Sequence, residues 1–220
     1  MQKVNNVIKF GEDVHGYSVP VLNEREIRAS AGIMFLTLFT SLMLVIFQNN
    51  FLLVKYVIVV FFTDFIIRVL ISPRFSPTLI IGRLIVGNQV PEYVGAPQKK
   101  FAWKIGLALS SLMFILLIIV NSYSVITVSI CWICLVFLFF ESAFGICLGC
   151  IVYRLLYKEE ALHCAGEICE TTARQSIQRT SLVQVLIIFG FIVLILMAIA
   201  FLNERFTVAP RHLRDVIGMM

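Results

Sequence analysis

Four uncharged apolar stretches, each close to the length that crosses a lipid bilayer, constrain the fold of this chain more than any other feature. A helix needs about 17–25 predominantly apolar residues to cross the hydrocarbon core. Because 60% of the residues are hydrophobic and 14% are charged, a soluble fold would expose more apolar surface than water tolerates. The sequence therefore predicts an all-α, polytopic membrane helical bundle. The four stretches are residues 29–47, 105–120, 125–140 and 182–202.

One further apolar stretch, residues 51–71, carries three charged side chains and permits two interpretations. Lys55, Asp64 and Arg68 would suit a buried helix of the soluble type. A membrane helix is favoured, because its neighbours span and because the short polar segment 48–50 suits a tight turn between antiparallel helices. We therefore predict four core transmembrane helices and a fifth, C-terminal one.

The chain divides into a polar N-terminal arm, a membrane domain, a polar linker and a last hydrophobic helix. No apolar core precedes residue 29, so we expect the first spanning helix, and no cleaved signal, to direct insertion. The predicted boundaries are 1–24 for the arm, 25–160 for the four-helix membrane domain, 161–181 for the cysteine-bearing linker and 182–220 for the C-terminal helix and tail.

The distribution of Lys and Arg predicts the orientation. These residues gather before the first helix and between the second and third helices, are absent from the turn 121–124, and return in 154–179. Since positive loops stay on the cytoplasmic side, the N-terminus of this multi-pass protein is expected in the cytoplasm. The basic tail (Arg205, Arg211 and Arg214) then lies outside, a conflict that a last helix folded along the interface would remove.

The long connection between the second and third helices is predicted to follow the membrane surface. Proline ends the second helix within residues 72–77. The segment 78–86 places apolar side chains around Arg83 and could lie in the headgroup plane, with the arginine against phosphate. Interfacial anchoring therefore explains the basic and aromatic residues of 98–104, and the net charge of +5 follows from topology. No nucleic-acid-binding module is present in the sequence, so no nucleic-acid partner is expected.

Four segments of the sequence have a distinctive pattern: residues 21–32 (VLNEREIRASAG), 72–77 (SPRFSP), 91–103 (PEYVGAPQKKFAW) and 144–150 (FGICLGC). Together they resemble an integral-membrane family of bacteria, the domain of unknown function 4395, and residues 164–170 (CAGEICE) are similar to a cysteine pair in part of that family. The similarity spans roughly residues 10 to 160. It implies a four-helix membrane domain in the inner (plasma) membrane of a bacterium and brings no established activity.

Besides Lys55, three ionisable residues fall within apolar stretches, where charge is costly. Asp64 and Arg68 are one helical turn apart, so we expect an intramembrane ion pair between them. Glu141 has several open interpretations: a neutral hydrogen-bonded acid, half of an ion pair with Arg68 as one partner, a proton carrier, or the base that activates a thiol.

The apolar run 125–153 carries two C-x-x-C pairs, Cys131/Cys134 and Cys147/Cys150. Such a pair on a helix has the geometry of a redox dithiol or of half a metal site. If the run is one continuous helix, Cys131 and Cys147 are roughly 24 Å apart and cannot share a metal. The deeper pair is expected to be packing residues.

The second pair has more chemical options, because glycines and the membrane edge give access to it. With Cys164 and Cys169 of the linker, Cys147 and Cys150 could hold zinc or an iron–sulfur cluster, or the two pairs could exchange disulfides. A cytoplasmic location argues against a permanent disulfide.

Three hypotheses about function follow. The first is thiol redox or sulfur transfer by Cys147 and Cys150, with Glu141 as a proton carrier and a thioredoxin-like or rhodanese-like partner. The second is a structural metal-binding membrane module. The third is a small-solute transporter that uses Asp64, Arg68 and Glu141. Motifs of common soluble enzymes are absent from the sequence.

Overall fold

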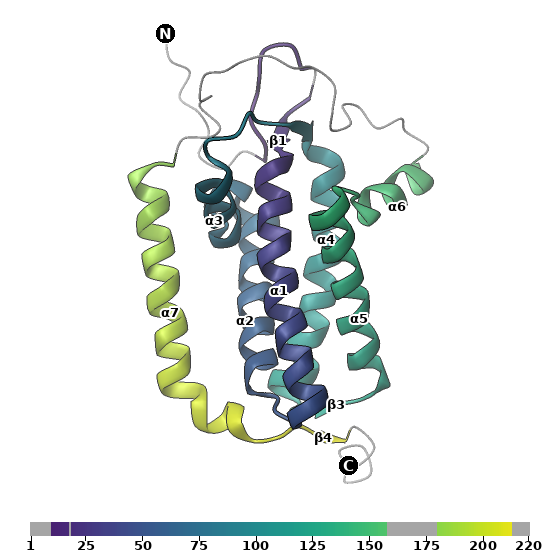
Figure 1. Ribbon diagram of the computed structural model, residues 1–220, viewed down its shortest axis with the longest axis vertical. Coiled ribbons are helices and arrows are strands. Elements are labelled where there is room, and N and C mark those ends of the chain that lie inside the picture. The colour runs from purple at the N-terminus through teal and green to yellow at the C-terminus, as the bar shows by residue number, and fades with distance from the viewer. Residues whose placement is uncertain (1–9, 18, 158–179, 213–220) are drawn as a thin grey trace.

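The computed structural model describes residues 10–17, 19–157 and 180–212 and shows a bundle of long helices (Figure 1). The predicted all-α class is confirmed, because within these described ranges strands are confined to four segments of two or three residues. The elements are β1 (Val21–Asn23), α1 (Glu24–Gln48), α2 (Leu52–Ile66), η1 (Ile67–Ile71), η2 (Pro73–Phe75), α3 (Pro77–Val86), β2 (Tyr93–Gly95), α4 (Ala96–Phe114), η3 (Ile115–Ile119), β3 (Ser122–Tyr123), α5 (Val125–Phe139), η4 (Phe140–Phe144), α6 (Leu148–Tyr157), α7 (Leu182–Thr207) and β4 (Arg211–His212).

α1 is the central helix and has a clear cap at each end. The side chain of Asn23 accepts a hydrogen bond from the backbone N–H of Arg25 (3.2 Å), which satisfies one of the donors that a helix start leaves free. Asn49 adopts the left-handed conformation (φ 51°) and its N–H donates to the carbonyl of Val45 (3.0 Å). The chain therefore turns within a few residues and returns as α2, as predicted.

α2 and the π-helical η1 after it complete the second core helix and bury its charges within the bundle. Lys55, Asp64 and Arg68 are each 3% exposed or less. The apolar clusters of the core join α1, α2, α4 and α5, through residues such as Met34 and Leu135. The charged stretch 51–71 is therefore a member of the membrane bundle.

The short helix α3 packs against α1, and the expectation that its Arg83 faces phosphate is wrong. α3 packs so closely on α1 that a Cβ on Gly82 would lie 2.5 Å from the carbonyl oxygen of Glu26. Arg83 is 6% exposed, and its Nε donates to the carboxylate of Glu26 (3.0 Å). A buried acid partner on α1 thus takes the place that phosphate was expected to fill.

The starts of α1 and α4 are tied together by a two-stranded antiparallel sheet. β1 pairs with β2 in the register Val21↔Gly95, and the carbonyl of Pro20 accepts a hydrogen bond from Ala96 (2.9 Å). This clamp holds the N-terminal ends of two spanning helices side by side, which matters because Glu24 and Lys99 lie directly after it.

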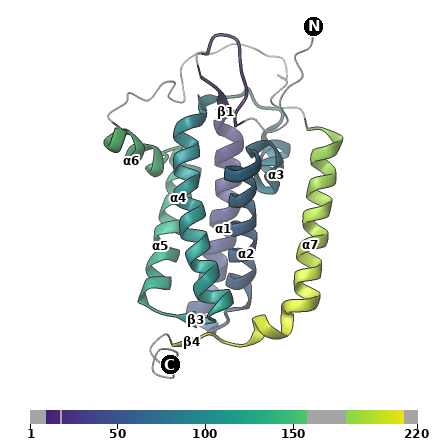
Figure 2. The same ribbon diagram turned by 180° about the vertical axis from the view of Figure 1, so that it is seen from behind.

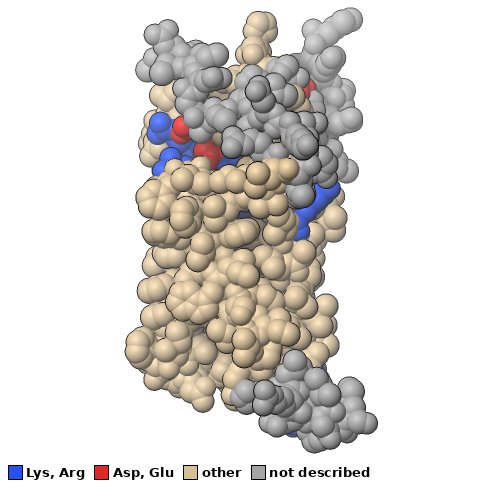
Figure 3. All heavy atoms as spheres, turned by 90° about the vertical axis from the view of Figure 1, so that its right-hand side faces the viewer, with Lys and Arg blue, Asp and Glu red and all other residues tan. Residues whose placement is uncertain are grey.

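Four helices of the described residues are long and apolar enough to cross a membrane, and the protein is a multi-pass membrane protein. On the face that Figure 3 shows, charged side chains gather in a band near one end of the bundle, and a surface without charged residues follows. The four are Glu24–Gln48, Ala96–Ile119, Val125–Phe144 and Leu182–Thr207.

α7 runs alongside the other long helices over the height of the bundle and does not lie across one end of it (Figures 1 and 2). At its start, the side chain of Gln184 donates to the carbonyl of Arg74 (2.9 Å). At its far end, Lys55 Nζ donates to the carbonyl of Val208 (2.6 Å), and β4 pairs with β3 in parallel. The helix that was expected either to span or to lie on the interface therefore spans, and the basic residue Arg211 lies at the end opposite the charged band.

Candidate dithiol site

The run 125–153 is broken at Gly145, so the expectation of one continuous helix is wrong. α5 passes into the π-helical η4, and Gly145 then takes a left-handed conformation (φ 68°) that other residues adopt only at a cost. Its N–H donates to the carbonyl of Glu141 (3.2 Å), which ends the helix. α6 consequently leaves the end of the bundle at an angle (Figure 1). The separation of roughly 24 Å between Cys131 and Cys147 assumed an unbroken helix and loses its basis.

Cys147 caps the start of α6. Its Sγ accepts a hydrogen bond from the backbone N–H of Cys150 (3.3 Å), and its carbonyl accepts from the N–H groups of Cys150 (2.9 Å) and Ile151 (3.1 Å). The positive end of the α6 dipole thus faces the sulfur. Both thiols are free and partly buried.

The two sulfurs also interact with each other. A side-chain hydrogen bond with Cys150, and then burial, raise the pKa of the Cys147 thiol, whereas the charge of Lys99 acts to lower it. A dithiol that shares a hydrogen bond holds one proton firmly, so its reactivity depends on the neighbouring charges.

The close approach of α6 to α4 fixes the position of the dithiol. Gly149 lies between the two cysteines, and a Cβ on it would be 2.6 Å from the Cβ of Ala102. The rings of Phe101 and Tyr153 pack at 5.4 Å between centroids. The glycine between the cysteines is therefore a packing requirement, because any side chain would push α6 off α4.

A buried lysine between two carboxylates lies next to this pair. Lys99 Nζ is 2.7 Å from Glu24 Oε2 and donates to Glu141 Oε1 at 2.5 Å. Lys99 is 4% exposed, and its charge acts on both Cys147 and Cys150. Glu141 is thus half of an ion pair, with Lys99 as its partner. The alternative partner suggested by the sequence, Arg68, is paired with Asp64.

Asp64 and Arg68 form the expected ion pair, with Arg68 Nε 2.6 Å from Asp64 Oδ2. Hydroxyl groups complete the network: Thr78 donates to Asp64 (2.8 Å) and accepts from Arg68, and Arg68 Nη2 donates to Ser30 (2.6 Å). Ser76 also donates to Asp64 (2.7 Å). These bonds join α1, α2, η1 and the start of α3, so the pair holds the helices together.

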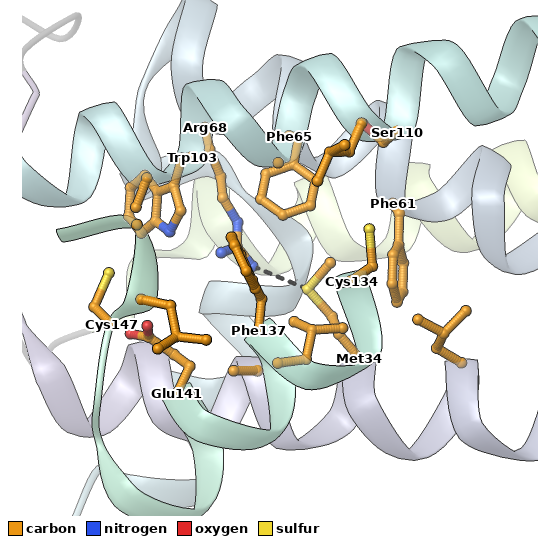
Figure 4. A pocket seen from close by; sticks show the side chains of 18 of the residues that line it. Met34, Phe61, Phe65, Arg68, Trp103, Ser110, Cys134, Phe137, Glu141 and Cys147 are labelled. Carbon is orange, nitrogen blue, oxygen red and sulfur yellow. Dashed lines mark hydrogen bonds between the residues drawn. The ribbon is translucent and has the colours of Figure 1, made fainter. Parts of the chain in front are cut away.

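A cavity of about 100 Å³ lies between the dithiol site and the Asp64–Arg68 network, because Cys147, Glu141 and Arg68 all line it. Cys147, Glu141, Arg68 and Trp103 lie on its walls, and the side chains converge from α1, α2, α4 and α5 (Figure 4). The remaining lining is mostly apolar. Cys131 and Cys134 also line it and belong to the packed core around Ile130.

Among the described residues, no group of three or more His, Cys, Asp or Glu side chains could hold a metal ion. Cys164 and Cys169 lie outside the described residues. The four-cysteine metal site with Cys147 and Cys150 therefore stays a prediction.

Sequence reasoning missed Lys99, Glu24 and Trp103 as members of the site. By their place in the sequence, Lys99 and Trp103 resemble interfacial anchors, and Glu24 falls at the end of the polar arm. One signal in the sequence could have found two of them. Glu24 and Lys99 carry opposite charges, and each lies shortly before an apolar run. The antiparallel β1–β2 pair places the starts of those two helices side by side.

Comparison with known proteins identifies the family. A family profile described as "Domain of unknown function (DUF4395)" matches residues 22–158, which include α1 to α6. No curated protein and no solved structure matches the chain. Since the match covers more than half of the chain, the protein belongs to the DUF4395 family.

Proposed function

We propose that this membrane protein performs thiol–disulfide exchange through Cys147 and Cys150 at the membrane edge. One observation carries the proposal: Cys147 caps a helix with its Sγ 3.3 Å from the backbone nitrogen of Cys150, beside the buried charge of Lys99. A helix N-terminus and a nearby cation both favour a thiolate, the form that attacks a disulfide, and they oppose the hydrogen bond with Cys150 and the burial that raise the pKa of Cys147.

The exchange needs a disulfide-bearing partner and no cofactor. One cysteine of the pair, as thiolate, attacks a partner sulfur, so that an S–S bond forms between the two proteins and the partner's own S–S bond breaks. The released partner thiolate takes up a proton. The second cysteine then attacks the mixed disulfide and frees the second partner thiol. The pair is oxidised by two electrons and the partner is reduced, and the reverse reaction follows the same path.

The partner fits a thioredoxin-like protein, because such a protein presents a reactive dithiol on its surface. A rhodanese-like protein is the alternative for sulfur transfer, in which a persulfide sulfur would pass to a Cys147 thiolate. Lys99 and Glu141 would tune the pair through their charges: the ammonium stabilises a thiolate, and the carboxylate keeps the ammonium in place.

The orientation that best fits the charges places the dithiol end in the cytoplasm of a plasma membrane. Arg25, Arg28, Arg74, Lys100 and Lys104 belong to elements that begin or end on the dithiol side. Since the cytoplasm keeps thiols reduced, the resting form of the pair would be the dithiol.

A redox titration of the purified protein tests the proposal. In a background with Cys164→Ser and Cys169→Ser, the protein is equilibrated with glutathione buffers and its thiols are counted by mass-shift alkylation. We expect one two-electron transition that Cys147→Ser or Cys150→Ser abolishes.

The other C-x-x-C pair of the same chain is the matched control. Cys131→Ser with Cys134→Ser should leave the transition in place, since these thiols are buried in the core. A transition that depends on Cys131 or Cys134, or no transition at all, would contradict the proposal. Stoichiometric zinc or iron in the purified protein would favour the metal-binding module instead, and flux lost in Glu141→Gln proteoliposomes would favour transport.

A further inference from the structure

The cavity beside the dithiol has the features of a ligand site. It measures about 100 Å³ and is lined by side chains of the bundle helices. Cys147 and Glu141 lie at one end, and apolar side chains such as Leu38 and Phe61 extend from there into the bundle. A molecule in this cavity would be mostly apolar and would contact the sulfur of Cys147.

A second observation concerns Trp103, whose indole N–H has no hydrogen-bond partner among the residues that the structure describes. Trp103 is 6% exposed and lines the cavity. Indole N–H groups inside proteins usually find an acceptor. This one is not among the fully buried unpaired polar atoms, so it stays accessible to a ligand. Figure 4 shows the ring of Trp103 at the cavity wall near Cys147, with the side chain of Arg68 beside it.

Arg68 strengthens the case for an acceptor-bearing ligand. Its guanidinium carbon lies 5.2 Å from the centroid of the Trp103 ring and 5.3 Å from that of Phe65. The resulting wall combines a cation, a free indole donor and flat aromatic surfaces. It suits a planar ring that carries carbonyl oxygens.

We propose that the cavity binds the ring of a membrane-soluble para-quinone, which accepts electrons from the dithiol. This inference rests on the proposed function, since it names the electron acceptor of the same pair. One quinone carbonyl would accept a hydrogen bond from the Trp103 indole, the ring would lie against the apolar wall, and the hydrocarbon tail would extend between helices.

The reaction balances without any further reactant. The S–H bonds of Cys147 and Cys150 break and one S–S bond forms, so that two electrons and two protons leave the pair. The quinone takes up both electrons and both protons, and two O–H bonds form on the quinol. Glu141 lies on the cavity wall and would carry protons between sulfur and quinone oxygen.

At about 100 Å³ the cavity is smaller than a quinone ring needs, so binding requires flexible side chains to move. An engineered apolar cavity of about 150 Å³ binds benzene. Met34 and Met113 line the cavity here, and unbranched thioether side chains repack at low cost.

Fluorescence of Trp103 tests binding directly. The chain has two tryptophans, so Trp132→Phe leaves Trp103 as the only one. This variant, in lipid nanodiscs, is titrated with decylubiquinone and, separately, with menadione. We expect saturable quenching, and an apparent affinity at least tenfold weaker in Ala31→Leu and in Ser110→Leu, which fill the cavity.

The matched control is Ala108→Leu, on the same helix as Ser110 but exposed on the outer face of the bundle, and it should bind as tightly as the parent. Quenching that is linear, or equal in the filled variants, would mean that the quinone only partitions into lipid and would overturn the proposal.

Electron transfer is tested separately, under anaerobic conditions, with pre-reduced protein. We expect one quinol for each pair of thiols lost, and none in Cys147→Ser. If quinone binds and no quinol forms, the role as acceptor is wrong. If quinone neither binds nor reacts while the glutathione titration still shows the Cys147–Cys150 transition, this inference fails and the proposed exchange function stands.

Discussion

The ammonium of Lys99 lies 2.5 Å from Oε1 of Glu141, and this contact joins the start of α4 to the end of the α5–η4 helix beside the dithiol. Glu24 completes the arrangement from α1 at 2.7 Å. One buried cation therefore neutralises acids from two other helices, and the end of the bundle depends on it.

Replacement of Lys99 should strongly destabilise the fold. Lys99→Met leaves two buried carboxylates without their cation, and breaking a buried ion pair costs about 3–5 kcal/mol. We expect a clear fall in the apparent melting temperature in detergent. The exposed Lys104→Met is the control and should change little. The triple variant Lys99→Met, Glu24→Gln, Glu141→Gln should regain part of the lost melting temperature. That result would identify the unpaired carboxylates as the cause of the loss.

Removal of Cys150 should make Cys147 more reactive at neutral pH. The hydrogen bond with Cys150 is the largest cause of the raised pKa of Cys147, so Cys150→Ala lowers that pKa and increases the thiolate fraction. In a background without the other four cysteines, the midpoint of the pH profile for maleimide labelling should fall. Lys99→Met in the same background should shift it upwards, because the ammonium lowers the pKa. An unchanged midpoint in Cys150→Ala would exclude the sulfur–sulfur contact.

A side chain at Gly145 should strain the break between η4 and α6. Gly145→Ala places a Cβ at φ 68° and 3.3 Å from Arg28 Nη1, and the left-handed conformation alone costs about 1–2 kcal/mol. We expect a lower melting temperature and altered labelling of Cys147. Gly190→Ala in α7, where a Cβ meets nothing within 4 Å, should be neutral or stabilising. Equal effects of the two variants would contradict this reading of the break.

The hydroxyl of Thr78 should contribute to stability through the Asp64–Arg68 network. Thr78→Val removes a donor to Asp64 and an acceptor for Arg68, and an unsatisfied buried polar group costs about 1–3 kcal/mol. Thermal unfolding in detergent measures the loss. Thr37→Val is the matched control, because the Thr37 hydroxyl is exposed and bonds only to carbonyls of its own helix. A loss no greater than that of the control would show that the network is not stabilising.

Lys55 should hold the far end of α7 to the bundle. Its Nζ donates to the carbonyls of Phe206 (3.3 Å) and Val208 (2.6 Å), which a helix end would otherwise leave free. Lys55→Met should speed hydrogen exchange at residues 205–208, while exchange at the start of α7, where Gln184 bonds to Arg74, stays unchanged. Uniform protection along α7 in the variant would mean that lipid, and not Lys55, holds this end.

The amino-acid sequence by itself determined the all-α membrane class, the number of long helices and the Asp64–Arg68 pair. Each of these follows from local rules: the length of an apolar run fixes a span, and a spacing of four places two side chains on one helical face. The family resemblance on residues such as those of 144–150 is also a property of the sequence alone, and the profile match confirms it.

Only the tertiary structure decided which charges meet and where the helix of the cysteines breaks. Glu24 and Lys99 are far apart in the chain, and the β1–β2 clamp brings them together, whereas helix packing adds Glu141. Gly145 could have continued an apolar helix, since glycine permits both conformations, and only the structure shows that it ends the helix. Contacts between side chains of different helices follow no periodic spacing in the sequence, because they depend on how deep each helix lies in the bundle and how it is rotated about its axis. The dithiol site is therefore visible only in the tertiary structure.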